Sequence, residues 1–211
     1  MAVVRVRQHV NPLSSKYQVK VEVPDWSAVY RHVDRPLHID IGCGKGLFLQ
    51  QMAHLQPDWN FLGLEIRKPV VEQAQERIRP AGLPNLQILF CNVNISFDEL
   101  LGSWGDKPPL RQVSIQFPDP WFKKRHQKRR VLQPDLVSSL ATHLPAGGRV
   151  VLQSDVEEVA VEMCDRMAEN PHFSRPEPEW LPTSPFPAQT DRERVTLEKG
   201  QPVFRAIFVR N

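Results

Sequence analysis

The stretch LHIDIGCGKG, from Leu37 to Gly46, joins a short apolar run to three glycines in alternation. A short apolar run that ends in turn residues is typical of a buried strand. Glycine has no Cβ atom, so the loop can turn tightly and a ligand can approach its backbone closely. Residues 47–55, LFLQQMAHL, then place apolar side chains at helical spacing. The order of strand, glycine loop and helix predicts the first unit of an α/β fold.

The same alternation continues along the chain. Short apolar runs that predict further strands occupy residues 61–66, 86–91, 112–117, 149–154 and 203–209. Helical patterns lie between them, at residues 69–78, 97–104, 134–144 and 156–170. Strands that alternate with helices indicate βαβ units. The sequence therefore predicts an α/β protein with a Rossmann-like, mostly parallel sheet and helices on both faces.

The length of 211 residues fits one domain with an extension. Residues 1–35 are predicted to form a basic arm with a short helix near Asp25–Val33, and residues 36–211 to form the main domain. A proline-rich stretch, residues 171–187, precedes the last predicted strand.

The composition excludes several classes of protein. Apolar residues make up 41% of the chain and charged residues 24%, which is ordinary for a globular protein, and the net charge is only +3. No apolar run approaches the roughly 20 residues that a membrane span needs, and the N-terminus has no secretory signal. The three scattered cysteines, Cys43, Cys91 and Cys164, argue against a disulfide framework or a zinc site. We expect a cytoplasmic protein with no membrane association and no metal.

Polar side chains and glycines follow the predicted strands. Ligands of such sheets bind outside the carboxyl ends of the strands. Five places lie there: Gly42–Gly46, Glu65, Asn92, Pro118–Trp121 and Asp155. The acid at the end of the second strand, Glu65, stands where a carboxylate can accept both hydroxyls of a ribose. The glycine spacing is G-x-G-x-G, whereas the dinucleotide fingerprint is G-x-G-x-x-G, which disfavours a dinucleotide oxidoreductase.

These residues resemble the pattern of the seven-stranded, S-adenosylmethionine-dependent methyltransferases. In that family a D/E-x-G-x-G-x-G loop lies along the methionine part of the cofactor and the acid of strand two holds the ribose. The resemblance implies a seven-stranded sheet and S-adenosylmethionine as the methyl donor. It implies cofactor-binding roles for Asp40, Gly42, Gly44, Gly46, Glu65 and Asn92, the last beside the adenine. The alternative is that Gly42 and Gly44 only make a tight connection between strand and helix.

A second motif, QFPDPWFKKRHQKRR, runs from Gln116 to Arg130. The motif places the carboxylate of Asp119 between two prolines, and the densest positive charge of the chain follows it. Such a local charge suggests a contact with a polyanion or, alternatively, a solvated basic surface. Phe117–Arg130 closely resembles the signature of the bacterial tRNA (guanine-N7-)-methyltransferases, in which P-D-P-W precedes a basic run. The motifs LGLEIR, LQSD and a late T-x-R-E also follow in that family's order, from about Pro36 to the C-terminus.

The resemblance implies a role for each matching residue. Asp119 is implied as the catalytic residue, and the substrate-binding residues are implied to be Lys123, Asp155, Thr190, Asp191, Arg192 and Glu193. The remaining basic residues are expected to contact RNA phosphates: Lys124, Arg125, Lys128, Arg129 and Arg130. The implied substrate is the variable-loop guanine at position 46 of tRNA, and the product 7-methylguanosine. This chain departs from the family at Asn92, where an acid is frequent, and around Thr190.

The chemistry of guanine fits this motif. N7 carries a lone pair and no proton, so its methylation needs positioning and electrostatics and no general base. One carboxylate can accept from both N1–H and N2–H of guanine and can stabilise the positive charge that forms on the ring. The prolines fix two φ angles around Asp119, as a preorganised anchor requires. Trp121 and Phe122 could stack on a base or pack in the protein, and Asp155 could instead cap the helix that follows it.

Two further alternatives stay open at the level of sequence. One is an amino methyltransferase acting on another base or on a protein. Those that act on adenine or cytosine carry D/N-P-P-Y/F/W, an order that differs from Pro118–Trp121. A non-catalytic RNA-binding protein would have no need of Asp40, Glu65 and Asp119 together. The partner is expected to be tRNA, and the protein a monomer or a homodimer.

Overall fold

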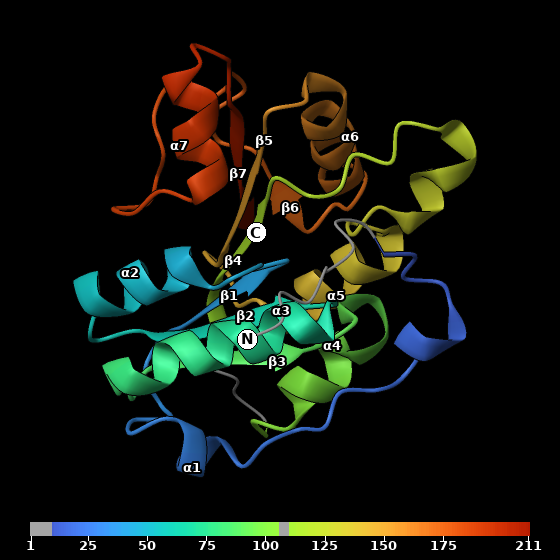
Figure 1. Cartoon of the computed structure of the whole chain (residues 1–211). Coiled ribbons are helices and arrows are strands. Elements are labelled where there is room, and N and C mark those ends of the chain that lie inside the picture. Colours follow the sequence, from blue (N-terminus) through green and yellow to red (C-terminus); the bar gives the residue numbers. More distant parts are fainter. Residues whose placement is uncertain (1–9, 106–109) are drawn as a thin grey trace.

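The computed structural model describes residues 10–105 and 110–211, which form one seven-stranded sheet in the order β3-β2-β1-β4-β5-β7-β6 (Figure 1). The first five strands are parallel neighbours, whereas β7 is antiparallel to both β5 and β6. The strands are β1 (Leu37–Ile41), β2 (Asn60–Glu65), β3 (Leu86–Phe90), β4 (Leu110–Gln116), β5 (Arg149–Ser154), β6 (Phe173–Ser174) and β7 (Phe204–Arg210). The predicted Rossmann-like α/β fold is confirmed.

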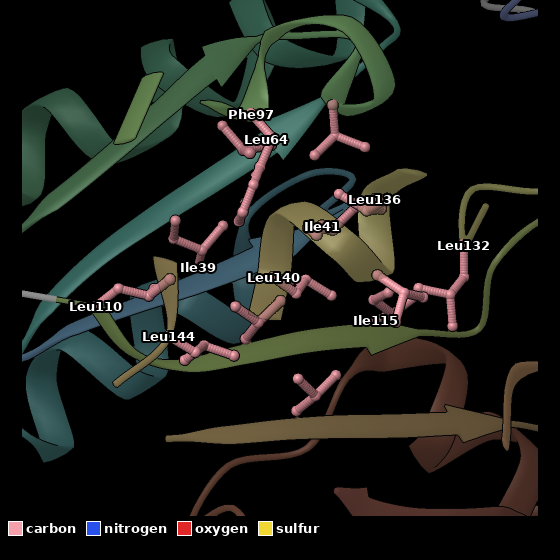
Figure 2. Close-up of a cluster of buried hydrophobic side chains, with 14 of the residues drawn as sticks. Ile39, Ile41, Leu64, Phe97, Leu110, Ile115, Leu132, Leu136, Leu140 and Leu144 are labelled. Carbon is pink, nitrogen blue, oxygen red and sulfur yellow. The ribbon is translucent and has the colours of Figure 1, made fainter. Parts of the chain in front are cut away.

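Helices cover both faces of the sheet. Two separate apolar clusters mark these faces, one packed under α4, α5 and α6 and the other under α2 and α3. Figure 2 shows part of the first cluster, in which Leu136 and Leu140 of α5 lie over Ile41 and Ile115 of the sheet. The helices are α1 (Trp26–Val29), α2 (Leu47–Leu55), α3 (Lys68–Ile78), α4 (Val93–Gly102), α5 (Pro134–His143), α6 (Glu157–Ala168) and α7 (Asp191–Glu198).

Three elements differ from the sequence patterns. The two-residue strand β6 lies inside the proline-rich stretch, and it is too short to give a periodic signal. Helix α7 covers a segment that could have been a polar loop, because its residues DRERVTLE are mostly charged. The basic run folds as a short 3-10 helix, η3 (Lys124–Arg129). Figure 1 shows α6 and α7 beside β5 and β7, at the opposite end of the sheet from β3.

Part of the predicted N-terminal arm packs into the main core. The indole of Trp26 stacks on Trp104 with ring centroids 3.6 Å apart, and its Nε1 donates to Ser103 Oγ at 2.7 Å. Tyr30 is buried and its hydroxyl donates to the carbonyl of Phe61 at 3.0 Å. The first nine residues of the arm lie outside the described residues. In the described part of the chain, none of the helices has the length and apolar character to cross a membrane.

Candidate active site

The carboxyl ends of β1, β2, β3 and β4 meet at a cavity of about 140 Å³. This is the edge of the sheet at which the sequence predicts ligand binding. Residues from all four strand ends line the cavity, among them Gly42, Glu65, Arg67, Asn92, Gln116 and Asp119. The parallel topology therefore brings the predicted cofactor acid and the predicted catalytic acid to one cavity.

Glycine is required at the three positions of the loop for two different structural reasons. Gly42, Gly44 and Gly46 all have positive φ angles, of 82°, 56° and 70°, which side chains with a Cβ atom rarely adopt. A Cβ atom added at Gly42 or Gly44 would meet open space, so only the backbone conformation requires glycine there. A Cβ atom at Gly46 would collide with the side chain of Ile88. Gly46 therefore also permits the close packing of α2 on β3.

Glu65 ties the glycine loop to the end of β2. Its side chain is only 3% exposed. Its Oε2 accepts from the backbone N–H of Gly44 at 3.1 Å, and its Oε1 accepts from the N–H of Arg67 at 2.9 Å. The guanidinium of Arg67 adds Nε–Oε1 and Nη2–Oε2 hydrogen bonds, both 2.9 Å long. The carboxylate thus accepts four hydrogen bonds, which is about its full capacity.

Arg67 is a site residue that the sequence patterns did not single out. Its pKa is raised first by the hydrogen bond with Glu65, and further by the negative charges of Glu65 and Asp119, although partial burial acts in the opposite direction. Arg67 thus interacts electrostatically with both predicted acids. The only signal in the sequence was its spacing: residues i and i+2 along an extended segment point to the same side.

Asp40 is buried and held by two neighbours from β4. Its Oδ1 accepts from Ser114 Oγ at 2.6 Å and from Gln116 Nε2 at 3.0 Å. Burial raises the pKa of Asp40 to about 6, against the lowering effect of these two hydrogen bonds. The carboxylate is therefore expected to change its charge near pH 6.

A chain of buried polar side chains leads from Asp40 to α7. Gln153 of β5 donates to Gln116 Oε1 at 2.7 Å and approaches Glu193 Oε2 at 3.4 Å. Glu193 is 0% exposed, and its Oε1 accepts from Arg205 Nη2 at 2.7 Å. The structure therefore places the predicted substrate residue Glu193 inside the protein, paired with an arginine. Its predicted contact with substrate stays a prediction.

The other residues of the late motif lie at the start of α7. Thr190 is the N-cap of this helix, and its Oγ1 accepts from the N–H of Glu193 at 3.0 Å. Arg192 reaches back to Asp155 at the end of β5, with Nε–Oδ2 at 2.8 Å. Asp191 is exposed in the first turn. The structure thus joins two segments that the sequence predicts to bind substrate.

The alternative role of Asp155 as a helix cap is wrong. Helix α6 begins at Glu157, its N-cap position is Val156, and no side chain caps it there. The polar side chain that stabilises this connection is Ser154, whose Oγ accepts from the N–H of Val156 at 3.0 Å. Asp155 instead directs its carboxylate to Arg192.

The turn that carries Asp119 has an unusual backbone. Phe117 and Trp121, which flank Pro118–Asp119–Pro120, have positive φ angles of 50° and 41°. Such a conformation in a bulky residue costs on the order of 1–3 kcal/mol and persists only where the surroundings enforce it. With φ also fixed at both prolines, the backbone on either side of Asp119 is closely defined. Asp119 lines the cavity.

The two aromatic residues after the turn differ in their surroundings. Trp121 lines the cavity, and the Arg129 guanidinium lies over its ring with Cζ 5.0 Å from the centroid. His126 contacts the same ring edge-on at 5.6 Å. Phe122 is 66% exposed. Trp121 therefore packs against the basic run, and Phe122 is the aromatic side chain presented to solvent.

The basic run divides into exposed and enclosed residues. The exposed ones are Lys123, Lys124, Arg125 and Lys128. Arg129 is partly covered by its contact with Trp121, and Arg130 is only 5% exposed and is paired with Glu158 and Glu162. Phosphate binding by Arg130 stays a prediction, and its two carboxylate partners argue against it.

Asn92 connects the cavity to the N-terminal arm. Its side-chain amide donates to the carbonyls of Pro12 and Tyr17, at 3.2 and 3.0 Å. Val10 and Pro12 of the arm also line the cavity. The Oδ1 atom of Asn92 is thus the part of the side chain left for the predicted contact with adenine. Within residues 10–105 and 110–211, no group of three or more His, Cys, Asp or Glu side chains could hold a metal ion.

Comparisons with known proteins agree with this geometry. Residues 34–206 match the family described as "Putative methyltransferase". The chain is 57% identical to the tRNA (guanine-N(7)-)-methyltransferase of Synechococcus elongatus, over 100% of this chain and 98% of that protein. It is 54% identical to the protein of the same name from Microcystis aeruginosa, with 99% of each chain covered.

Solved structures at low identity share the fold. The 16S rRNA (adenine(1408)-N(1))-methyltransferase of Catenulisporales acidiphilia has a TM-score of 0.59 at 16% identity and covers 88% of this chain and 89% of its own. The 16S rRNA methyltransferase KamB has the same TM-score and identity and covers 90% of this chain and 95% of its own.

Proposed function

The chain belongs to the tRNA (guanine-N(7)-)-methyltransferase family, and we propose that it transfers the methyl group of S-adenosylmethionine to N7 of guanine in tRNA. The observation that carries this function is the position of Asp119. Its carboxylate stands on a constrained turn at the cavity that Glu65 and the glycine loop also line. By resemblance to the family, the target is the variable-loop guanine at position 46.

The residues of the cavity fit S-adenosylmethionine. A Cβ atom at Gly42 or Gly44 would meet open space, and Asn92 lines the cavity. The two ribose hydroxyls would donate to Glu65, in place of the two hydrogen bonds from the Arg67 side chain. When bound, this cofactor supplies a methyl group on a positively charged sulfur.

Asp119 would act by position and charge. Guanine N7 has a lone pair and no proton, so the protein needs no general base at that atom. The carboxylate of Asp119 would accept from N1–H and N2–H of guanine, whereas adenine presents an acceptor at N1 and would be rejected. Its negative charge would also stabilise the positive charge that forms on the ring. Holding the two reactants in line can supply on the order of 7–11 kcal/mol of the barrier.

The tRNA would be held by charge outside the cavity. The exposed Lys123, Lys124, Arg125 and Lys128 follow the catalytic turn directly and are suited to phosphate oxygens. Asp155 and Arg192, joined at the end of β5, would contact the substrate beside Asp119, with Thr190 and Asp191 adjacent. Identity of 51–57% over the full length favours this function over an amino methyltransferase, a non-catalytic RNA-binding protein or an oxidoreductase.

The organisation and location of the protein follow from this function. Residues 36–211 would be the methyltransferase domain, and residues 1–35 an arm that contributes Val10 and Pro12 to the cavity wall. We place the protein in the cytoplasm, where tRNA is modified. We propose that it acts as a monomer or a homodimer, two states that measurements of mass in solution distinguish.

Digestion of methylated tRNA tests the function directly. Unmodified tRNA is incubated with the protein and with S-adenosylmethionine that carries an isotopically labelled methyl group. The tRNA is then digested to nucleosides, which are separated by liquid chromatography and identified by mass spectrometry. We expect labelled 7-methylguanosine, and none from a tRNA in which guanine 46 is replaced by adenine. A label on an exocyclic amino group or on another base would contradict the proposal.

A further inference from the structure

Arg130 ends the basic run but differs from the exposed residues before it. Its side chain is 5% exposed, while Arg125, an arginine of the same run, is exposed. Arg130 Nε donates to the backbone carbonyl of Pro120 at 2.8 Å. Its Nη1 donates to Glu162 and its Nη2 to Glu158 at 3.4 Å, both on α6. One guanidinium thus connects the turn that carries Asp119 to a helix of the core.

The hydrogen bond from Arg130 to Pro120 restrains a turn whose backbone is strained. Phe117 and Trp121 hold positive φ angles on either side of Asp119, and such strain relaxes unless the surroundings oppose it. Proline has no N–H, so the carbonyl is the only backbone hydrogen-bonding group of Pro120. At the other end of the turn, the N–H of Phe117 donates to the carbonyl of Gln153 at 2.8 Å. Asp119 is therefore held between two fixed points, and Arg130 provides the second.

The charges around Arg130 make it a poor ligand for phosphate. Glu158 and Glu162 neutralise its guanidinium, and the side chain is almost inaccessible to solvent. A phosphate oxygen would have to displace a partly buried carboxylate to reach it. Removing one partner of such an arrangement leaves the other charge unpaired, so the pairing favours the enclosed position.

We propose that Arg130 is a positioning residue for the methyl transfer, which fixes Pro120 to α6 and so holds the Asp119 carboxylate in the cavity, and that it does not bind RNA phosphate. This inference rests on the proposed function and deepens it at the same site. It separates two arginines, only five positions apart, into different roles: Arg125 acts on the affinity for tRNA, and Arg130 acts on turnover.

Three single variants test this division. Arg130→Ala is compared with Arg125→Ala and with Arg166→Ala, which removes an arginine that also pairs with Glu162, from within α6, at 3.7 Å. The measurements are kcat, KM for tRNA, the dissociation constant of S-adenosylmethionine, and the slope of log affinity for tRNA against log salt concentration. Circular dichroism and thermal unfolding report whether each variant is folded.

We expect Arg130→Ala to lower kcat by about 10²-fold, because a displacement of about 1 Å at a positioned group can cost that much. Its affinities for tRNA and for S-adenosylmethionine should stay within about twofold of the wild type, and its salt slope should be unchanged. Arg125→Ala should raise KM for tRNA and reduce the salt slope by about 0.7–0.9, because one phosphate is no longer neutralised. Arg166→Ala should keep the wild-type kcat.

Arg130→Lys keeps the charge in the enclosed site and carries the test if Arg130→Ala fails to fold. A lysine cannot reproduce the planar fork that reaches Pro120 and two carboxylates at once, so kcat should still fall, with the salt slope unchanged. A reduced salt slope with normal kcat in either Arg130 variant would make Arg130 a phosphate ligand and overturn the inference. Wild-type kcat and slope together would overturn it as well. A wild type that forms no 7-methylguanosine would instead contradict the proposed function, and with it this inference.

Discussion

The guanidinium of Arg67 donates two hydrogen bonds to the carboxylate of Glu65, Nε–Oε1 and Nη2–Oε2, each 2.9 Å long. The backbone N–H groups of Gly44 and Arg67 complete four hydrogen bonds to the same carboxylate. Arg67 also interacts with the charge of Asp119. The acid proposed to hold the cofactor and the acid proposed to hold guanine therefore both interact with one cation, the guanidinium of Arg67.

Replacing Glu65 by alanine should weaken the binding of S-adenosylmethionine. Each hydrogen bond to a charged group contributes about 1.5–3 kcal/mol, so we expect affinity to fall by at least about tenfold. Isothermal titration calorimetry measures it, with Glu76→Ala as a control for an exposed glutamate on α3. Unchanged affinity in a folded Glu65→Ala variant would remove Glu65 from the cofactor site.

The basic run should contribute to the affinity for tRNA and not to the affinity for S-adenosylmethionine. Joint replacement of Lys124, Arg125 and Lys128 by alanine should weaken tRNA binding and flatten its salt dependence by about 0.7–0.9 slope units for each phosphate that is no longer neutralised. Filter binding at several salt concentrations gives the slope, and Lys199→Ala, an exposed lysine at the C-terminal end of α7, serves as the control. An unaltered slope would show that the run is a solvated surface.

Much of the fold was predictable because its signals are local. The strands β1 to β5 and β7 all give short apolar runs that end at polar or glycine residues, and topology then places their carboxyl ends together. In contrast, β6 has only two residues, too few to show an alternation of apolar and polar side chains. α7 has no apolar stripe, and its stability comes from the Thr190 cap and from Glu193, which is buried against β7.

The site was predictable to the same extent. Gly42–Gly46, Glu65, Asn92 and Asp119 line or border the cavity because each lies at the carboxyl end of a strand. The position of Arg130 could not be read from the sequence, since its partners Glu158 and Glu162 are 28 and 32 residues away on another element. A run of six similar cations conceals which member is enclosed, and only packing distinguishes them.

Asp40 should make stability depend on pH between about 4 and 6. Burial raises its pKa from the ordinary 3.8 to about 6, so in this range the folded protein holds a proton that the unfolded chain releases. The free energy of unfolding therefore falls as the pH rises through this window, by about 3 kcal/mol in total, and the loss remains above pH 6.

Asp40→Asn replaces the buried carboxylate by a neutral amide, so the variant should not lose stability as the pH rises from 4 to 6. In urea unfolding of the cofactor-free protein, the variant should be more stable than the wild type at pH 7–8 by up to about 3 kcal/mol, and the difference should shrink toward zero near pH 4. The same variant should bind S-adenosylmethionine more weakly. Parallel pH curves for the two proteins would show that Asp40 does not titrate in this range.

Glu193 should be important for stability because its ion pair is buried. Glu193→Ala leaves Arg205, which is 4% exposed, without its carboxylate partner, and breaking such a pair costs about 3–5 kcal/mol. The matched control on the same helix is Glu198→Ala, since the exposed Glu198–Arg194 pair should contribute less than about 0.5 kcal/mol. If urea unfolding shows equal small losses and KM for tRNA rises instead, Glu193 acts at the substrate.

Asp119 should determine turnover with little effect on binding. Asp119→Asn keeps the size of the side chain but removes its charge, and its NH₂ group would face a guanine donor. Asp119→Ala removes both acceptors. We expect kcat to fall by around 10²-fold or more in each, as when one preorganised electrostatic group is lost. The affinity for S-adenosylmethionine should be little changed, and that for tRNA should fall modestly, because phosphate contacts supply most of it.

The absence of a proton at N7 gives this prediction a second measurement. If Asp119 anchors guanine and stabilises the developing charge, added imidazole, a base that has no carboxylate, should not restore activity to Asp119→Ala, since no proton has to be removed at N7. Single-turnover assays with saturating tRNA separate the methyl transfer from product release. Near-normal turnover in Asp119→Asn would reduce Asp119 to a residue of the turn. It would leave the strain at Phe117 and Trp121 without a catalytic purpose.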